Sequence, residues 1–247
     1  MTLDDVQGRI AAKKAELDRL RPLAAEALRR LQKHWDVELT YTSNAIEGNT
    51  LTLRETAEVI EHGITVGGKT LKEHLEAVDH YEAVLWMREL AGQTAALGEE
   101  VVRELHRRVV ARSEPGIAGA YSRHPRRIAG SPVVFPNAAK IPELMAAFGR
   151  ALEGAPAMPM AAFDAHFRLT AIHPFSDGNG RTARLLMNLI LLRGGYPPVA
   201  VRPEDRSAYL DALERGSLAD DLGPFQTLMH ERLDATLGEY VAVLREG

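Results

Sequence analysis

Apolar residues recur every three or four positions along most of this chain, which is the spacing of helices that bury one face. Near the N-terminus the apolar stripe runs from Ile10 to Trp35, and Pro22 interrupts it. Since proline lacks the backbone donor that a helix interior needs, we expect the helix to kink or restart there. The same spacing predicts an all-α fold, with further helices over residues 52–62, 71–91, 99–111, 141–152, 160–172 and 180–193, and two more within 207–244.

Local signals mark where some of these helices begin and end. Thr52 and Glu55 have the spacing of a capping box, in which each side chain bonds the backbone amide of the other residue. Gly63 is a typical helix stop. Between residues 113 and 137 the helical spacing disappears, and prolines and glycines separate two short β-prone pieces. We interpret this segment as a loop that contains a small β-hairpin.

The composition is that of a folded protein, and it excludes several classes of function. The chain has 247 residues, of which 45% are hydrophobic and 26% charged, and its formal net charge is −4. An acidic chain argues against a dedicated nucleic-acid binder, which needs a basic face. Cysteine is absent from the sequence, so disulfides, iron–sulfur clusters and thiol nucleophiles are excluded. There is neither a basic, apolar leader nor an apolar run of about 20 residues, and we therefore expect a cytoplasmic protein without membrane contact.

One short stretch of the chain combines features of an anion site. Gly178, Asn179 and Gly180 all tolerate the left-handed backbone conformation, so successive backbone amides can point into one concavity. Such a nest at a helix N-terminus binds anions, and phosphates above all. Arg181 and Arg184 follow on the first turns of the predicted helix. Two fixed cations beside a nest indicate a polyphosphate ligand.

Two titratable residues complete the stretch. His173 precedes a proline that ends the preceding helix, and an imidazole can act as a general base near neutral pH. Asp177 lies just before the nest, and one carboxylate together with phosphate oxygens is the usual way to hold Mg²⁺. A glycine turn between solvated helices would explain an isolated Gly-Asn-Gly. It does not explain a base, a carboxylate, a nest and two cations so close together.

These residues match, at every defined position, the signature His-Pro-Phe-x-(Asp/Glu)-Gly-Asn-Gly-Arg-x-x-Arg of the Fic (filamentation induced by cAMP) family. The resemblance covers most of residues 36–230, including a hairpin segment upstream of the motif and a Tyr-Pro-Pro after it. It implies a Fic-type helical bundle with a small β-hairpin flap. It also implies an enzyme that uses ATP and Mg²⁺ and transfers AMP to a Ser, Thr or Tyr hydroxyl of a target protein.

The resemblance gives each residue of the loop a role. His173 would deprotonate the target hydroxyl, and Asp177 would bind the Mg²⁺ that bridges the α- and β-phosphates. Gly178, Asn179 and Gly180 would cradle the phosphates, and Asn179 would also donate through its side chain.

The resemblance extends to residues that follow or precede this loop. Arg181 would help to hold the β-phosphate, and Arg184 the γ-phosphate. Tyr209 follows the motif helix where relatives contact adenine, although a packing role explains it equally well. The flap would bind the target backbone by adding a strand, and its residues would be Ile128, Ala129, Gly130 and Val133.

A second motif lies upstream of the catalytic one. Residues 43–48 match the inhibitory signature of the same family, (Ser/Thr)-x-x-x-Glu-(Gly/Asn). Ser43 and Glu47 are one helical turn apart, and Gly48 is a good helix stop. The resemblance implies that Glu47 pairs with Arg184, so that ATP binds with its α-phosphate misplaced for attack. Without the catalytic motif, an ordinary exposed helix end would be the simpler interpretation.

Residues 63–70 fit the P-loop pattern Gly-x-x-x-x-Gly-Lys-(Ser/Thr). That pattern indicates a nucleotide site only between a buried strand and a helix, and here a charged, helix-patterned segment precedes it. We interpret residues 63–70 as a connection between two helices, in which Thr70 caps the second.

We expect three regions in the chain: an N-terminal helical region over residues 1–100, with the inhibitory helix at about 36–48, a Fic catalytic core over 101–230 and a C-terminal helix tail over 231–247. Three alternative functions stay open: a deAMPylase, a transferase of another phosphate-containing group, and a catalytically silent nucleotide-sensing module. The intact His173 argues against the silent module. The sequence leaves the oligomeric state open, with a homodimer as one option.

Overall fold

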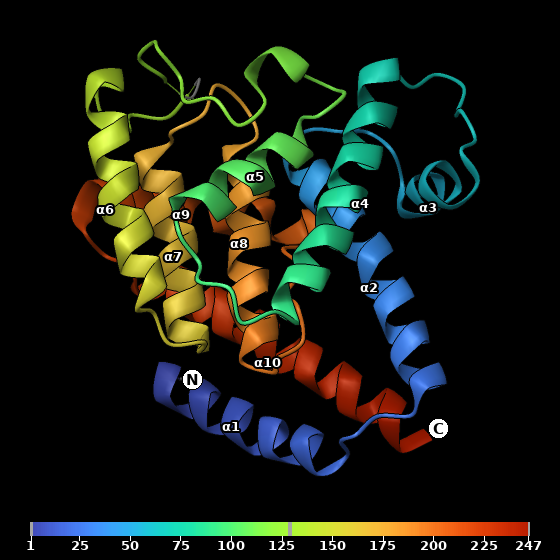
Figure 1. Ribbon diagram of the computed structural model, residues 1–247. Helices are drawn as coiled ribbons and strands as arrows, with labels where there is room; N and C mark the ends of the chain where they lie inside the picture. The colour runs from blue at the N-terminus through green and yellow to red at the C-terminus, as the bar shows by residue number, and fades with distance from the viewer. Residues whose placement is uncertain (1, 128–129, 247) are drawn as a thin grey trace.

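A computed structural model describes residues 2–127 and 130–246, and its helices pack into one body (Figure 1). The predicted all-α architecture is confirmed for these residues. No described helix combines the length and the apolar character that crossing a membrane requires. The α-helices are, in chain order, α1 (Leu3–Arg19), α2 (Ala25–Ile46), α3 (Leu53–His62), α4 (Leu71–Ala91), α5 (Glu99–Val109), α6 (Ile141–Glu153), α7 (Pro159–Ile172), α8 (Asn179–Arg193), α9 (Arg206–Ala219) and α10 (Gly223–Glu246).

Helix α8 lies at the centre of the body, and α4, α5 and α7 pack against it (Figure 1). Every residue from Arg181 to Leu191 is buried. A helix that is buried on all sides belongs to the core of a protein rather than to its surface. Because α8 also begins with part of the predicted catalytic motif, the packing of the core determines where that motif lies.

The N-terminal apolar stripe is split where Pro22 predicts a break, since α1 ends at Arg19 and α2 begins at Ala25. Helix α1 runs alongside α10 (Figure 1) and buries Val6 and Ile10. Helix α2 packs against α3, α4 and α8 instead. The end of α2 is thereby brought beside the start of α8, although more than a hundred residues separate them in the sequence.

The predicted caps of α3 and α4 are confirmed. The Thr52 hydroxyl accepts from the amide of Glu55 at 3.2 Å, and the Glu55 carboxylate accepts from the amide of Thr52 at 2.8 Å. Thr70 caps α4 in the same way. Residues 63–70 therefore connect two helices, and the ammonium of Lys69 donates to the backbone carbonyl of Thr50. This placement agrees with the interpretation that the segment is not a P-loop.

The predicted β-hairpin is wrong for the part of the 113–137 segment that the structure describes, which contains no paired strands. Pro125 and Pro132 offer no amide donors to a ladder. The amide of Val133 donates to the hydroxyl of Ser131 instead of to a neighbouring strand. A hairpin without a third strand is also only marginally stable. The described part of this segment is a loop, although its amino-acid composition is typical of strands.

Asp79 of α4 is fully buried and holds the turn that follows α5. Its carboxylate accepts from the backbone amides of Arg112 and Ser113, each at 2.8 Å, and from the Ser113 hydroxyl at 2.9 Å. The Arg112 guanidinium adds an ion pair at 3.1 Å. One carboxylate therefore satisfies several donors that have been removed from water.

We expect Asp79→Ala to lower the free energy of unfolding by about 3 kcal/mol, because buried amides lose their acceptor. Asp79→Asn should cost less, since one acceptor oxygen remains. Urea denaturation followed by circular dichroism measures both losses. Glu82→Ala is the control, because it removes only an exposed ion pair with Arg112 and should cost less than about 1 kcal/mol. Equal losses for Asp79→Ala and Glu82→Ala would contradict this account.

Candidate active site

A cleft of about 450 Å³ opens beside the N-terminus of α8. Pockets that bind small ligands commonly measure about 300–1,000 Å³. The walls come from the end of α2, the loop between α7 and α8, the helix α9 and the loop around residue 133. The predicted site residues that line the cleft are Glu47, Gly130, Val133, His173, Asp177, Gly178, Asn179, Gly180, Arg184 and Tyr209.

The other predicted residues lie elsewhere. Ser43 and Gly48 belong to the end of α2 and its following turn, and Arg181 is buried behind the cleft wall. Ile128 and Ala129 of the predicted flap lie outside the described residues.

The loop between α7 and α8 turns at two left-handed residues, His173 with φ 51° and Gly178 with φ 74°. Of the three residues that tolerate positive φ, Gly178 adopts it and Asn179 and Gly180 do not. Asn179 and Gly180 already belong to the first turn of α8. The cleft still faces the amide end of a helix, where unpaired N–H groups and the helix dipole attract anions. The anion site is a helix N-terminus with one left-handed glycine in front of it.

Asn179 closes this loop through its side chain. The carboxamide oxygen accepts from the amide of Phe175, and the carboxamide nitrogen donates to the carbonyl of Phe175, both at 2.9 Å. Only 3% of Asn179 is exposed. The side chain thus fixes the loop in this structure, and its expected donation to a phosphate stays a prediction.

His173 faces the cleft at the end of α7. Its ring stacks on Phe135, with centroids 4.0 Å apart. Burial lowers the pKa of His173 below its ordinary value of 6.5, although a hydrogen bond to the backbone of Thr170 and the charge of Glu47 act in the opposite direction. The imidazole is therefore neutral at pH 7 and can accept a proton.

Asp177 lines the cleft, and 47% of its side chain is exposed. One carboxylate oxygen accepts from the amide of Gly178 at 2.6 Å, and the other lies 3.4 Å from Arg181. Burial raises the pKa of Asp177, but Arg181, the Gly178 amide and Lys72 lower it, and the lowering is larger. An ionised carboxylate at the mouth of an anion site is a suitable ligand for a hard cation such as Mg²⁺.

The ion pair expected from the second motif is present. Arg184 is 4% exposed, and its guanidinium donates to Glu47 Oε1 at 2.7 Å. The same guanidinium donates to the hydroxyl and the carbonyl of Ser43, both at 2.9 Å. Gly180 makes room for the carboxylate, because a Cβ on this residue would lie 2.3 Å from Glu47 Oε1. The turn after Glu47 continues through Gly48, whose φ is 98°.

Tyr209 is 1% exposed, and its ring belongs to the core. Its hydroxyl lies 3.3 Å from Arg184 Nη1 and 2.9 Å from His166 Nε2. The buried hydroxyl therefore accepts from the arginine and donates to a neutral histidine. This placement supports Arg184 from behind and favours the packing role over the adenine contact.

Sequence patterns do not identify two further residues of the site. Arg206 lines the cleft and donates from Nε to the carbonyl of Ile46 at 2.9 Å, at the end of α2. Arg126 donates to the hydroxyls of Ser122 and Ser176 and thereby ties the extended loop to the loop between α7 and α8. Both contacts join segments far apart in the chain, so the spacing of residues within one segment does not predict them.

His106 of α5 supports the loop from inside the core. Its Nδ1 accepts from the amide of Gly119 at 2.9 Å, and its Nε2 lies 3.0 Å from the carbonyl of Asp177. The ring stacks on Phe175, with centroids 3.7 Å apart. Burial lowers the pKa of His106 to about 4. A neutral ring with its proton on Nε2 satisfies both contacts.

The sequence and the fold resemble those of known proteins. The sequence profile of the Fic/DOC family matches residues 96–191. The protein adenylyltransferase Fic of Drosophila persimilis is 35% identical over 223 residues, which are 88% of this chain and 43% of that relative. The chain therefore spans less than half the length of this curated relative.

Two solved structures resemble nearly the whole chain. A Fic-domain-containing signalling protein from Bacteroides thetaiotaomicron has a TM-score of 0.88 and 29% identity, covering 96% of this chain and 97% of that one. A variant fragment of Fic-1 from C. elegans has a TM-score of 0.82 and 30% identity, covering 96% of this chain and 72% of that one. The arrangement of helices around the cleft is thus shared with these proteins.

We expect His106→Phe to lower the free energy of unfolding by about 2 kcal/mol, because the phenyl ring keeps the stacking but loses both buried hydrogen bonds. Urea denaturation measures the loss. His62→Phe at the exposed end of α3 is the control and should change the free energy by no more than about 0.5 kcal/mol. A His106→Phe protein as stable as the control would show that the two hydrogen bonds contribute nothing.

Proposed function

Because this chain belongs to the Fic/DOC family, we propose that it is a protein adenylyltransferase, which transfers AMP from ATP to a Ser, Thr or Tyr hydroxyl of a target protein. The observation that supports this most strongly is the position of His173, Asp177 and Arg184 on the walls of one cleft at the N-terminus of α8. A neutral base, a carboxylate and a buried cation there are the groups that phosphoryl-type transfer needs.

In the proposed reaction, the target hydroxyl oxygen attacks the α-phosphorus of ATP. His173 takes the hydroxyl proton as the new P–O bond forms. The bond between the α-phosphorus and the oxygen that bridges to the β-phosphate breaks, and pyrophosphate leaves. The products are the AMP-modified side chain and pyrophosphate, and His173 returns its proton to solvent. Positioning and charge neutralisation carry most of such a reaction.

Other residues of the cleft would bind the phosphates of ATP. The amides at the start of α8 face the cleft and would hold phosphate oxygens. Arg184 would hold the γ-phosphate when it is released from Glu47. Arg181 does not line the cleft, and its expected contact with the β-phosphate would require a rearrangement of its ion pairs.

Asp177 would hold a Mg²⁺ ion together with phosphate oxygens of ATP. Its carboxylate is half exposed at the cleft, which fits a single protein ligand of this cation. The described residues contain no group of three or more His, Cys, Asp or Glu side chains that could hold a metal, so the nucleotide would supply further ligands. The bound cation would neutralise charge on the phosphates.

We further propose that Glu47 inhibits the transfer. Its carboxylate occupies Arg184, an arginine that lines the cleft. A charge-assisted Arg–carboxylate bond in a poorly solvated site is strong. ATP would then bind with its γ-phosphate displaced, and a shift of about 1 Å at the reacting phosphorus costs on the order of 100-fold in rate.

One observation favours a second activity, the removal of AMP from a modified target. Glu47 lines the same cleft as His173 and is close enough to raise its pKa. A carboxylate in this position could orient a water molecule for attack on a phosphodiester. The homodimer stays a prediction made from the sequence. The target protein is specified only as one that carries a Ser, Thr or Tyr hydroxyl.

Self-labelling by ATP that carries its label on the α-phosphate tests the proposed function. We expect Glu47→Gly, assayed with Mg²⁺, to incorporate at least about tenfold more label than the wild type, because Arg184 becomes available to the γ-phosphate. Glu47→Gly/His173→Ala should incorporate none, because the base is lost.

The double variant must also bind ATP, which calorimetry checks. Label in the double variant would exclude His173 as the base. Equal label in Glu47→Gly and the wild type would contradict inhibition by Glu47. No label in any variant that binds ATP would favour removal of AMP or another donor.

The pH dependence of labelling by Glu47→Gly follows from the lowered pKa of His173. A base with a lowered pKa stays neutral to lower pH, so the rate should be level near pH 7 and fall only below the ordinary value of 6.5. Loss of the Glu47 charge moves this limb further in the same direction. Initial rates at saturating ATP between about pH 5 and 8 measure it. A midpoint at or above 6.5 would contradict the buried, neutral state of the imidazole.

A further inference from the structure

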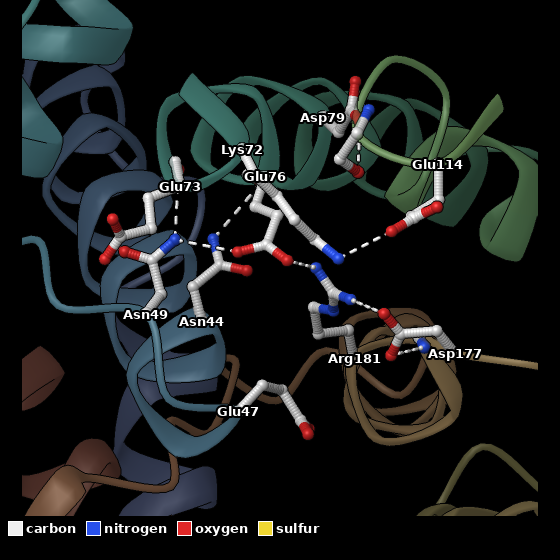
Figure 2. Close-up of polar contacts among 12 residues, drawn as sticks. Asn44, Glu47, Asn49, Lys72, Glu73, Glu76, Asp79, Glu114, Asp177 and Arg181 are labelled. Carbon is white, nitrogen blue, oxygen red and sulfur yellow. Dashed lines mark hydrogen bonds and ion pairs between the residues drawn. The ribbon is translucent and has the colours of Figure 1, made fainter. Parts of the chain in front are cut away.

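Arg181 lies between two carboxylates that belong to different parts of the fold (Figure 2). Its Nη1 is 3.4 Å from Glu76 of α4, and its Nη2 is 3.4 Å from Asp177 at the cleft. The guanidinium is buried to 98%, since only 2% of its side chain is exposed. Its Nε and Nη1 have no hydrogen-bond partner among the described residues. The guanidinium is therefore held by electrostatic attraction to the two carboxylates rather than by a bidentate pair of hydrogen bonds.

The two carboxylates differ in their exposure to solvent. The side chain of Glu76 is 14% exposed, whereas that of Asp177 is 47% exposed. Glu76 Oε2 also accepts from the carboxamide of Asn49 at 3.0 Å, and this carboxamide donates to the backbone carbonyl of Glu73 at 3.0 Å. Glu76 is thus fixed on its helix by a residue of the turn that follows Glu47.

Two further charges in this region are already paired. Lys72 also lowers the pKa of Asp177, and its ammonium lies 2.6 Å from Glu114 (Figure 2). Glu47 points away from this group in Figure 2 and binds Arg184. Glu76 is consequently the carboxylate that shares Arg181 with Asp177.

We propose that Glu76 is a positioning residue that neutralises Arg181 from the core side and so leaves the Asp177 carboxylate free to face the cleft. This inference rests on the proposed function, in which Asp177 takes a divalent cation with the phosphates of ATP. A buried guanidinium cannot lose its proton, so it needs an anion close by. Glu76 supplies that anion from a position that cannot reach the ligand.

Without Glu76, Asp177 is the remaining carboxylate beside Arg181. The attraction between opposite charges is strong where water is scarce. The more exposed Asp177 side chain would then turn from the cleft onto the guanidinium, which it already contacts, and a cation bound beside ATP would lose its protein ligand. Loss of a residue that orients a metal ligand typically costs 10–100-fold in metal affinity.

Calorimetric titration with ATP tests this role without relying on turnover. The parent protein is Glu47→Gly/His173→Ala, in which Arg184 is released and transfer is blocked. Titrations with Mg²⁺ and with EDTA separate the cation-dependent part of ATP affinity from the rest. With Glu76→Gln added, we expect the affinity in Mg²⁺ to fall about tenfold and the affinity in EDTA to change less than about twofold.

Two further variants distinguish positioning from a general effect of charge. Asn49→Ala keeps every charge but releases the Glu76 carboxylate, and we expect a smaller loss of the same Mg²⁺-dependent part, about threefold. Glu82→Gln removes a carboxylate six residues further along α4, where its partner is Arg112, and should change neither affinity. Glu76→Asp keeps the charge and should retain part of the Mg²⁺-dependent affinity for ATP that Glu76→Gln loses. It also provides a test if Glu76→Gln proves unstable on heating.

The outcomes separate the two proposals. If the parent binds ATP more tightly with Mg²⁺ and Glu76→Gln behaves as the parent does, the positioning role is wrong and the proposed function stands. Equal losses in Mg²⁺ and EDTA would also overturn the positioning role, since Glu76 would then act on the nucleotide through Arg181. A parent that binds no ATP under either condition would contradict the proposed function, and the positioning role with it.

Discussion

The site depends on the burial of a charge that cannot be neutralised by losing a proton. Arg184 is 4% exposed and must be surrounded by acceptors in every state of the protein. Ser43, Tyr209 and Glu47 supply them here. The first two hold the guanidinium in place, whereas Glu47 lies in the cleft, where we propose that a phosphate of ATP replaces it. The core thus fixes the cation, and in the proposed function a carboxylate and a phosphate compete for it.

Much of this arrangement could be predicted because it rests on short-range signals. Capping boxes such as Thr52–Glu55 fix helix starts from the identity of residues three positions apart. Apolar positions spaced by three and four residues indicate which segments are helical. The pairing of Glu47 with Arg184 could be anticipated because two separate motifs each carry one partner. In all three cases the decisive information lies within a few neighbouring positions or a recognisable signature.

The errors share a physical cause, which is competition among local options. The segment around Val133 has strand-like composition, yet the amide of Val133 donates to the Ser131 hydroxyl, and the described residues around it have no partner strand. Asn179 also takes a local option, since its side chain closes its own loop through two bonds to Phe175, and its contact with a phosphate stays a prediction. The roles of Glu76 and His106 could not be predicted from the sequence for another reason. Their partners, Arg181 and the carbonyl of Asp177, are brought to them by the packing of α4 and α5 on α8.

The narrow space above Gly180 restricts how such a protein can change during evolution. A side chain on this residue would collide with the Glu47 carboxylate, and the same space lies over the helix end that faces the ligand. A substitution there would displace the Glu47 carboxylate and obstruct the proposed ligand in one step. Under the proposed inhibition, mutations that raise activity should therefore arise in the last turn of α2 rather than in α8. The α2 side of this ion pair can vary from one descendant to another, while the α8 side has little freedom to change.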